Sequence, residues 1–160
     1  MADLNRLLQR LCAANVDFVI VGGFGAVLHG SSLLTRDLDV CAVLTPENVE
    51  KLREAFRDLN PIHRMTPQRL SFLDNPDPGV SVRNLYLQTD FGPLDLLGEI
   101  TGVGNFHEVA ARAIAVELFG LKVRVISIED LITAKESLGR EKDHLAAKEL
   151  RAILEKSRRR

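Results

Sequence analysis

Residues 22–40 read GGFGAVLHGSSLLTRDLDV, and they follow the apolar run VDFVIV at residues 16–21. The apolar run predicts a buried strand. The paired glycines predict a sharp turn, because a residue without a Cβ lets the backbone bend tightly and approach a ligand closely. The apolar residues after the turn suit a short helix, whose first N–H groups would face a phosphate. The stretch therefore predicts a strand, a phosphate-binding turn at Gly22 and Gly23, a helix and a second strand.

Two aspartates, Asp37 and Asp39, occupy alternate positions at the start of the second predicted strand, residues 37–44. Alternate residues of a strand point to the same face of the sheet, so the two carboxylates project together. Neighbouring carboxylates repel each other, and burial raises their pKa values unless a cation is present. Magnesium prefers oxygen ligands and bridges carboxylates to substrate phosphates. The spacing therefore predicts a magnesium site on this strand.

Other interpretations of the same residues have to be weighed. No lysine follows the glycines at the spacing of a P-loop, and Gly23-Phe24-Gly25 lacks the third glycine of a dinucleotide-binding turn. Taken alone, the glycines could form a turn without a ligand, and the two aspartates could lie on a solvated strand edge. A third acid further along the chain, Asp95, favours the metal site, because three such acids are harder to explain by structure alone than two.

The double glycine, the run TRDLDV at residues 35–40 and the later run LDLL at residues 94–97 resemble, in that order, the signature of the DNA polymerase beta-type nucleotidyltransferase superfamily. They look most like the small bacterial group of AbiEii/AbiGii toxin-like nucleotidyltransferases. The resemblance implies an α+β fold, the minimal nucleotidyltransferase fold, with a mixed β-sheet, flanking helices and a helical C-terminal part. It also implies a third catalytic carboxylate on a later strand, for which Asp95 is the best candidate.

By the same resemblance, the protein transfers a nucleoside monophosphate from an NTP to an acceptor hydroxyl. Two Mg²⁺ ions held by Asp37, Asp39 and Asp95 would support the reaction, and Asp95 would also take the hydroxyl proton. The acceptor stays open among tRNA, a protein and a small hydroxylated molecule. An antitoxin partner and a dimer are compatible with the resemblance, and the sequence decides neither. The alternative function is a non-catalytic nucleotide-binding or interaction module that retains the fold.

The candidate nucleotide-binding residues lie in the glycine turn, in the loop before the acidic strand and in the C-terminal helices: Gly22, Gly23, Ser31, Ser32, Thr35, Arg36, Lys135, Lys142 and Asp143. The serine and threonine hydroxyls suit phosphate oxygens, whereas Arg36 fits a surface salt bridge at least as well. Lys135 and the R-x-K-D element at residues 140–143 enter by resemblance, and a lysine provides a point charge for a triphosphate. A solvated helix face is the alternative for this charged stretch.

Composition predicts a single globular domain over residues 1–160. Hydrophobic residues make up 46% of the chain, and 21 lysines and arginines against 22 acids leave no overall basic field of the kind that marks a nucleic-acid binder. Within the domain we expect a catalytic α/β core at 1–126, C-terminal helices at 127–156 and a frayed basic tail at 157–160.

Three further observations favour a cytoplasmic protein without a membrane anchor. The chain has no apolar run long enough to span a bilayer, and its first residues lack the pattern of a signal peptide. Cys12 and Cys41 match no zinc or redox spacing, so we expect two reduced core cysteines.

Local patterns predict the remaining elements. Helical spacing of leucines follows Asp3, a Thr45-Pro46 pair begins another helix, and Ser127 can cap a third. Strands and further helices are expected at residues 82–89, 94–97, 106–113, 114–118, 123–126 and 140–155, with the two pairs 82–89/94–97 and 114–118/123–126 forming hairpins.

Overall fold

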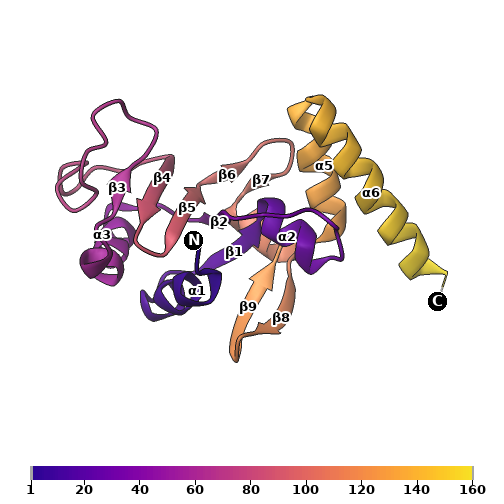
Figure 1. Cartoon of the computed structure of the whole chain (residues 1–160), viewed down its shortest axis with the longest axis horizontal. Coiled ribbons are helices and arrows are strands. Elements are labelled where there is room, and N and C mark those ends of the chain that lie inside the picture. Colours follow the sequence, from indigo (N-terminus) through magenta and orange to yellow (C-terminus); the bar gives the residue numbers. More distant parts are fainter. Residues whose placement is uncertain (1, 160) are drawn as a thin grey trace.

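A seven-stranded mixed sheet forms the centre of the protein, whose computed structural model describes residues 2–159 (Figure 1). The strand order across the sheet is β3-β4-β5-β2-β1-β9-β8. The strands are β1 (Phe18–Val21), β2 (Leu38–Ala42), β3 (Ile62–His63), β4 (Asn84–Thr89), β5 (Gly92–Leu97), β8 (Ile114–Leu118) and β9 (Leu121–Val125). Two short strands, β6 (Glu99–Ile100) and β7 (Gly104–Asn105), form a separate antiparallel pair.

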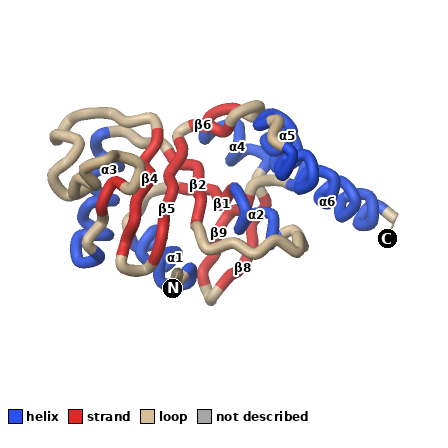
Figure 2. The backbone as a smooth tube through the Cα atoms, turned by 45° about the horizontal axis from the view of Figure 1, so that its top comes forward, coloured by secondary structure: helices blue, strands red, loops and turns tan. Residues whose placement is uncertain are grey.

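The helices surround this sheet, and the chain begins and ends in a helix. They are α1 (Leu4–Ala13), α2 (Gly22–Leu28), α3 (Pro46–Phe56) with a 3₁₀ turn η1 (Arg57–Leu59), α4 (Phe106–Arg112), α5 (Ile128–Leu138) and α6 (Glu141–Arg158). Figure 2 shows β4, β5, β2 and β1 side by side across the molecule, with α3 at one end and α5 and α6 at the other. The predicted α+β architecture is therefore correct. Within residues 2–159, no helix is long and apolar enough to cross a membrane.

The predicted helix starts are confirmed by capping contacts. The side chain of Asp3 accepts a hydrogen bond from the N–H of Arg6 at the start of α1. Thr45 accepts one from Asn48 at the start of α3, where Pro46 is the first helical residue, and Ser127 caps α5. Such caps satisfy N–H groups that have no partner inside the helix, and each typically contributes about 1 kcal/mol.

The three central strands, β1, β2 and β5, carry the core, with β1 buried on both faces and β5 on one. Val19, Ile20, Val40, Leu94 and Leu96 are all fully buried. β1 runs antiparallel to β2 and parallel to β9, while β2 runs parallel to β5. Both predicted hairpins form, β4 with β5 and β8 with β9. The buried alternation on β4 and β5 fixes their register, since a slip by one residue would exchange their two faces.

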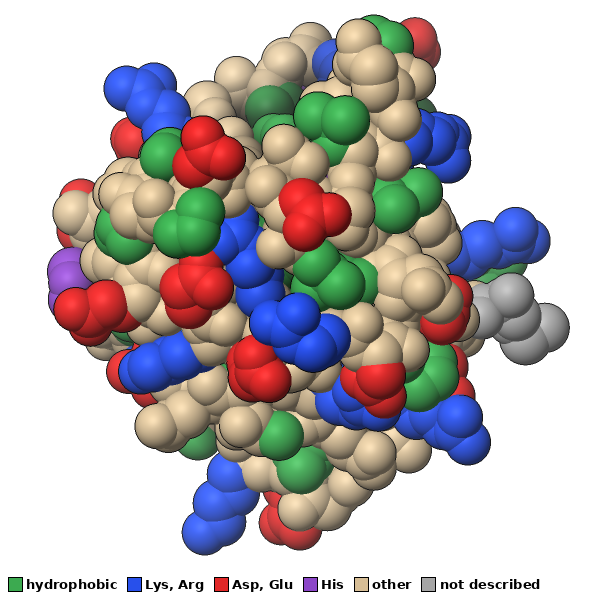
Figure 3. Space-filling view, turned by 90° about the vertical axis from the view of Figure 1, so that its left-hand side faces the viewer, with side chains coloured by type: hydrophobic (Ala, Val, Ile, Leu, Met, Phe, Trp, Pro, Cys, Tyr) green, Lys and Arg blue, Asp and Glu red, His purple; other side chains and the backbone are tan. Residues whose placement is uncertain are grey.

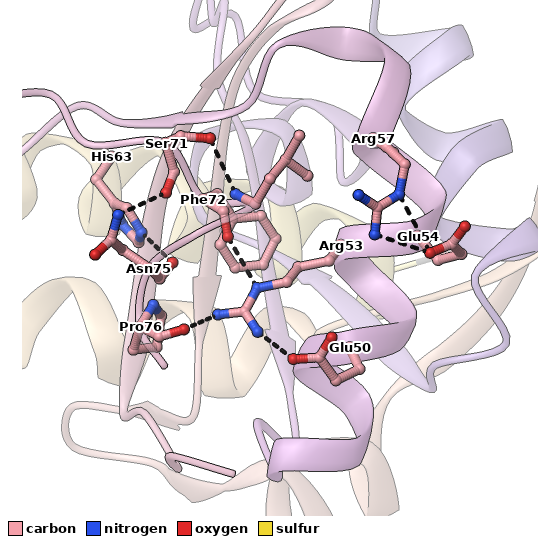
Figure 4. Close-up of polar contacts among 10 residues, drawn as sticks. Glu50, Arg53, Glu54, Arg57, His63, Ser71, Phe72, Asn75 and Pro76 are labelled. Carbon is pink, nitrogen blue, oxygen red and sulfur yellow. Dashed lines mark hydrogen bonds and ion pairs between the residues drawn. The ribbon is translucent and has the colours of Figure 1, made fainter. Parts of the chain in front are cut away.

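A buried arginine connects α3 to the irregular segment between β3 and β4 (Figure 4). The side chain of Arg53 is only 3% exposed, and its Nε donates a 2.8 Å hydrogen bond to the carbonyl of Phe72. The same guanidinium donates to the carbonyl of Pro76 and pairs with Glu50. This one side chain therefore satisfies loop carbonyls that neither sheet nor helix can reach.

Four details differ from the sequence-based expectations. Helix α6 continues to Arg158, so Ser157 and Arg158 of the predicted frayed tail are helical, and Arg160 lies outside the described residues. The glycine-rich segment at residues 101–105, for which no strand was predicted, contributes β7. Cys12 is exposed, which corrects its assignment to the core, whereas Cys41 is buried and burial raises the pKa of its thiol to about 11. Finally, β2 begins at Leu38, so Asp37 precedes the strand.

Candidate functional site

The sheet register brings two of the three predicted acids together. In the parallel pair of β2 and β5, Asp39 lies opposite Asp95, although the two residues are far apart in the chain. On the other side of β2, the antiparallel pairing places Val21 opposite Asp39. The chain therefore leaves β1 and enters the glycine turn directly beside the acidic pair.

Gly22 must be a glycine for two separate reasons. Its φ angle is +63°, a conformation that L-amino acids with a side chain rarely adopt. A Cβ at this position would lie 2.2 Å from Oδ2 of Asp39, closer than any real contact. The glycine turn predicted from sequence thus makes room for the carboxylate of Asp39 itself.

A cleft of about 510 Å³ opens above the two carboxylates. One wall is formed by the ends of the central strands and the other by α5, which contributes Lys135. A volume of this size is typical of small-molecule sites. The cleft is lined by Val21, Gly22, Asp39, Asn84, Tyr86, Asp95, Leu97, Glu99, Ile100, Thr101, Ile126, Leu131, Ala134, Lys135, Leu138 and Arg140.

The charged form of the Asp39 carboxyl is strongly disfavoured by its surroundings. Burial, followed by the negative charges of Asp95 and Asp37 and a hydrogen bond with Asp95, raises the pKa of Asp39 to about 7. The positive charge of Lys135 acts in the opposite direction. Perturbation by burial together with like charges in a cleft is typical of functional sites. At neutral pH the cluster therefore either retains a proton or binds a cation.

An arginine that the sequence did not suggest neutralises the third acid. Arg64 makes a two-pronged ion pair with Asp95, with Nη2 lying 2.9 Å from Oδ2 and Nη1 contacting Oδ1. Its guanidinium also lies 5.9 Å from the ring centre of Tyr86. The pKa of Arg64 is raised, mainly by the hydrogen bonds to Asp95.

The donor set suits a hard divalent cation, but the acids do not form a complete cage. Within residues 2–159, no three histidine, cysteine, aspartate or glutamate side chains converge on a single metal position. Arg64 engages both oxygens of Asp95, so this carboxylate already has a cationic partner. Asp39, whose raised pKa reflects unbalanced negative charge, and the nearby Asp37 retain carboxylate oxygens of the kind that Mg²⁺ prefers.

Lys135, one of the predicted nucleotide-binding residues, lines the cleft, and its positive charge acts on Asp39. Gly23 lies beside Thr35, whose Oγ1 would be 3.1 Å from a Cβ at Gly23. The Thr35 hydroxyl donates to the carbonyl of Asp37 at 3.3 Å, which shapes the approach to β2. Arg36 is exposed and does not line the cleft.

The structure does not bring Ser31 and Ser32 to the cleft. Both hydroxyls donate to the carboxylate of Glu149 on α6, at 2.5 Å and 2.7 Å respectively. These hydrogen bonds lower the pKa of Glu149. The two serines thus connect the loop after α2 to the last helix, and short-range sequence patterns could not indicate a partner so far along the chain.

The residues of the R-x-K-D element, Arg140 to Asp143, differ in where their side chains lie. Asp143 is 1% exposed and accepts a 2.6 Å hydrogen bond from Nε of Arg140. This contact, with a weaker effect of Lys135, lowers the pKa of Asp143. Lys142 is exposed and lies outside the cleft lining. Asp143 therefore holds one cleft residue, Arg140, and interacts through charge with another, Lys135.

Sequence reasoning missed three residues that line the site or contact its acids: Arg64, Asn84 and Tyr86. The alternating pattern of β4 indicated a strand without indicating which residues would face the cleft. Tyr86 is the cross-strand neighbour of Asp95, and the residue-by-residue register of the predicted β4–β5 hairpin would have identified it. Arg64 depends on the pairing of β3 with β4, for which the short β3 gives no recognisable pattern.

Comparison with known proteins agrees with this fold. The whole chain, residues 1–160, matches the family described as nucleotidyl transferase of unknown function (DUF2204). No protein of curated function matches the chain significantly.

Solved structures of nucleotidyltransferases share the fold along nearly the whole chain. A candidate nucleotidyltransferase from Thermotoga maritima is 20% identical, with a TM-score of 0.58 over 96% of this chain and 91% of its own. The lincosamide antibiotic adenylyltransferase LnuA, solved with lincomycin, is also 20% identical, with a TM-score of 0.60 over 95% of this chain and 98% of its own. ANT(2")-Ia, solved with adenylyl-2"-tobramycin, is 16% identical, with a TM-score of 0.50 over 93% of this chain and 97% of its own.

The glycine turn, the paired aspartates in register and the facing lysine of α5 thus lie within a fold that these solved structures share. The match over the full length shows that the chain belongs to the family of nucleotidyl transferases of unknown function.

Proposed function

We propose that the protein transfers a nucleoside monophosphate from an NTP, with ATP as the first candidate, to a hydroxyl of a small acceptor in the cleft above β2 and β5. The observation that carries the proposal is the opposition of Asp39 and Asp95 on the cleft floor, with Lys135 on the facing wall. Membership of a nucleotidyl transferase family gives the reaction class.

Asp37 and Asp39 would hold Mg²⁺ on the triphosphate side, and Asp95 would complete the acceptor side. The ions would neutralise triphosphate charge and lower the pKa of the acceptor hydroxyl. The mutual repulsion that raises the pKa of Asp39 supports this assignment, because cation binding would relieve it.

The remaining groups would act by positioning and by charge. The acceptor oxygen forms a bond to the α-phosphorus, the bond to the bridging oxygen breaks, and pyrophosphate leaves. Asp95 would accept the hydroxyl proton, and the ammonium of Lys135 would attract triphosphate oxygens. Because Gly22 and Gly23 have no side chains, their backbone would be able to approach the phosphates closely. Fixed charges of this kind stabilise a transition state without having to reorganise.

A small acceptor is favoured by the size and charge of the surface. The cleft measures about 510 Å³, and the protein has a formal net charge of −1. Figure 3 shows acidic and basic side chains interspersed on the face that carries α3, with no continuous basic surface there for a nucleic acid. Two enzymes of the same fold were solved with small antibiotics or their adenylyl products. The toxin-like alternative has tRNA or a protein as acceptor and an antitoxin as partner.

The test is labelling with each α-labelled NTP and Mg²⁺ in the presence of separate pools of cellular RNA, protein and small metabolites. We expect label in the metabolite pool with matching release of pyrophosphate, and neither with Asp39→Asn. Asp95→Asn should bind NTP but transfer nothing. Label in RNA or protein would establish the toxin-like acceptor class instead. No label and no pyrophosphate in any pool would leave a non-catalytic nucleotide-binding module.

A further inference from the structure

Arg64 is held against Asp95 more firmly than an ordinary surface arginine. Its backbone N–H donates to the carbonyl of Tyr86 at 3.0 Å, which extends the pairing of β3 with β4 by one residue. Its Nη1 also donates to the carbonyl of Leu87 at 3.3 Å. The side chains of Arg64 and Asp95 are only 22% and 14% exposed. Sheet, ring and carbonyl together therefore fix the guanidinium in one position.

That position is where positive charge would be needed during the reaction. The two bonds engage both oxygens of the Asp95 carboxylate, and the negative charges of Asp37 and Asp39 also act on Arg64. A planar guanidinium matches a carboxylate with two parallel hydrogen bonds and remains charged at any physiological pH. Arg64 thus stands as a permanent organic cation beside the three acids proposed to bind metal.

We infer that Arg64 is a built-in counter-ion that competes with a divalent cation for Asp95, so that this carboxylate becomes a metal ligand only when the arginine releases it. The inference rests on the proposed function, since it concerns the same three acids. It makes Arg64 a positioning residue that keeps the acceptor side of the cleft inactive until a ligand shifts the pairing.

The test measures binding of Mn²⁺, a spectroscopic substitute for Mg²⁺, by electron paramagnetic resonance, with and without a non-hydrolysable ATP analogue. In Arg64→Gln, the Mn²⁺ that depends on Asp95 should bind about tenfold tighter or more, because the metal no longer displaces charge-assisted hydrogen bonds. The same substitution in an Asp95→Asn background should give no such gain. Arg83→Gln is the matched control, because Arg83 is exposed and makes no side-chain hydrogen bond within residues 2–159.

Arg64→Lys keeps the charge but cannot form the two-pronged pair, so it should show a smaller gain, and it replaces the glutamine variant if that one fails to fold. Unchanged or weaker Mn²⁺ binding in Arg64→Gln, or an equal gain in Arg83→Gln, overturns the inference about Arg64. If the wild type still binds Mn²⁺ and the ATP analogue in that case, the proposed function stands. If the wild type and both Arg64 variants bind neither Mn²⁺ nor the ATP analogue, the inference and the proposed function are both wrong.

Discussion

Gly22 is the residue at which the backbone and the acidic site constrain each other most directly. Gly22→Ala would introduce both the cost of a positive φ angle and a clash with the carboxylate of Asp39. Gly120→Ala is a matched control, because its φ of +77° is similar and a Cβ there would meet nothing within 4 Å. We expect a loss of about 1 kcal/mol for Gly120→Ala and a clearly larger loss for Gly22→Ala, together with loss of NTP binding only in the latter. Urea unfolding and calorimetry would test both, and equal losses would contradict the close approach.

The raised pKa of Asp39 predicts a dependence of stability on pH. Because the folded state holds this proton more tightly than the unfolded chain, whose carboxyl has its ordinary pKa of 3.8, the contribution is fully present below about pH 4 and is lost as pH rises through about 7. In metal-free buffer, Asp39→Asn should therefore gain melting temperature relative to the wild type as pH increases from about 4 to about 8.

The control for this pH series is Asp77→Asn, which removes one charge at an exposed position. Scanning calorimetry of the three proteins at several pH values provides the measurement. A constant difference between Asp39→Asn and wild type across that range would show that the buried carboxyl does not titrate there.

Lys135 carries the third prediction at this scale. If its ammonium contacts triphosphate oxygens, Lys135→Ala should weaken NTP binding by about 10- to 150-fold, the equivalent of one charge-assisted hydrogen bond. The loss should be smaller for the corresponding NMP, which lacks the β- and γ-phosphates. Lys142→Ala is the control, because Lys142 is exposed and outside the cleft lining. Calorimetric titration with Mg²⁺ present measures both ligands, and equal affinities in the two variants would place Lys135 on a merely solvated face.

At the scale of elements, Arg53 links α3 to the segment before β4. Arg53→Met should cost about 2–4 kcal/mol, because the carbonyls of Phe72 and Pro76 would stay buried without a donor. Four residues further along the chain, at the start of η1, Arg57 forms an exposed pair with Glu54 (Figure 4). Arg57→Met should cost under about 0.5 kcal/mol, since such surface pairs contribute little. Similar urea midpoints for the two variants would contradict the structural role of Arg53.

The elements that sequence predicted well are those that local chemistry determines. Asp3, Thr45 and Ser127 cap helices whose N-termini they mark in any context. By contrast, the β6–β7 pair was missed, because Gly102 and Gly104 suggest a loop until their segment meets its partner. The length of α6 was underestimated because charged residues such as Lys156 can either extend a helix or fray.

At the scale of the whole molecule, the site could be predicted only where sequence neighbours share a strand or turn. Asp39, Asp95 and the glycine turn followed from strand patterns and resemblance, and the sheet joins them. Arg64 could not be predicted, because it reaches Asp95 through the tertiary pairing of β3, β4 and β5. The partner of Ser31 and Ser32 is Glu149, more than a hundred residues away, and no local pattern encodes that distance.

Binding of Mg²⁺ and ATP should stabilise the whole fold, because the cleft exists only when the sheet and α5 are assembled. At a ligand concentration about 100 times the Kd, the gain is about 2.7 kcal/mol, or about 5–10 °C in Tm for a chain of this size. Thermal unfolding with ATP alone, Mg²⁺ alone and both together measures the effect. Only the combination should give the full shift, and Asp39→Asn should abolish it; an identical shift with ATP in the presence of a chelator would contradict a metal-dependent site.

The register between β2 and β5 also means that formation of the site reports a late, long-range step of folding. Asp39 and Asp95 become neighbours only after strands separated by α3, β3 and β4 have paired in parallel, a long-range step that closes a large loop. The caps and hairpins involve nearby residues and can form earlier. In a refolding experiment, the recovery of metal-dependent nucleotide binding therefore reports the arrival of the central parallel pair, whereas helical circular dichroism reports what preceded it. Comparing the two time courses would reveal how long the chain is helical but unable to bind nucleotide before β2 and β5 have paired.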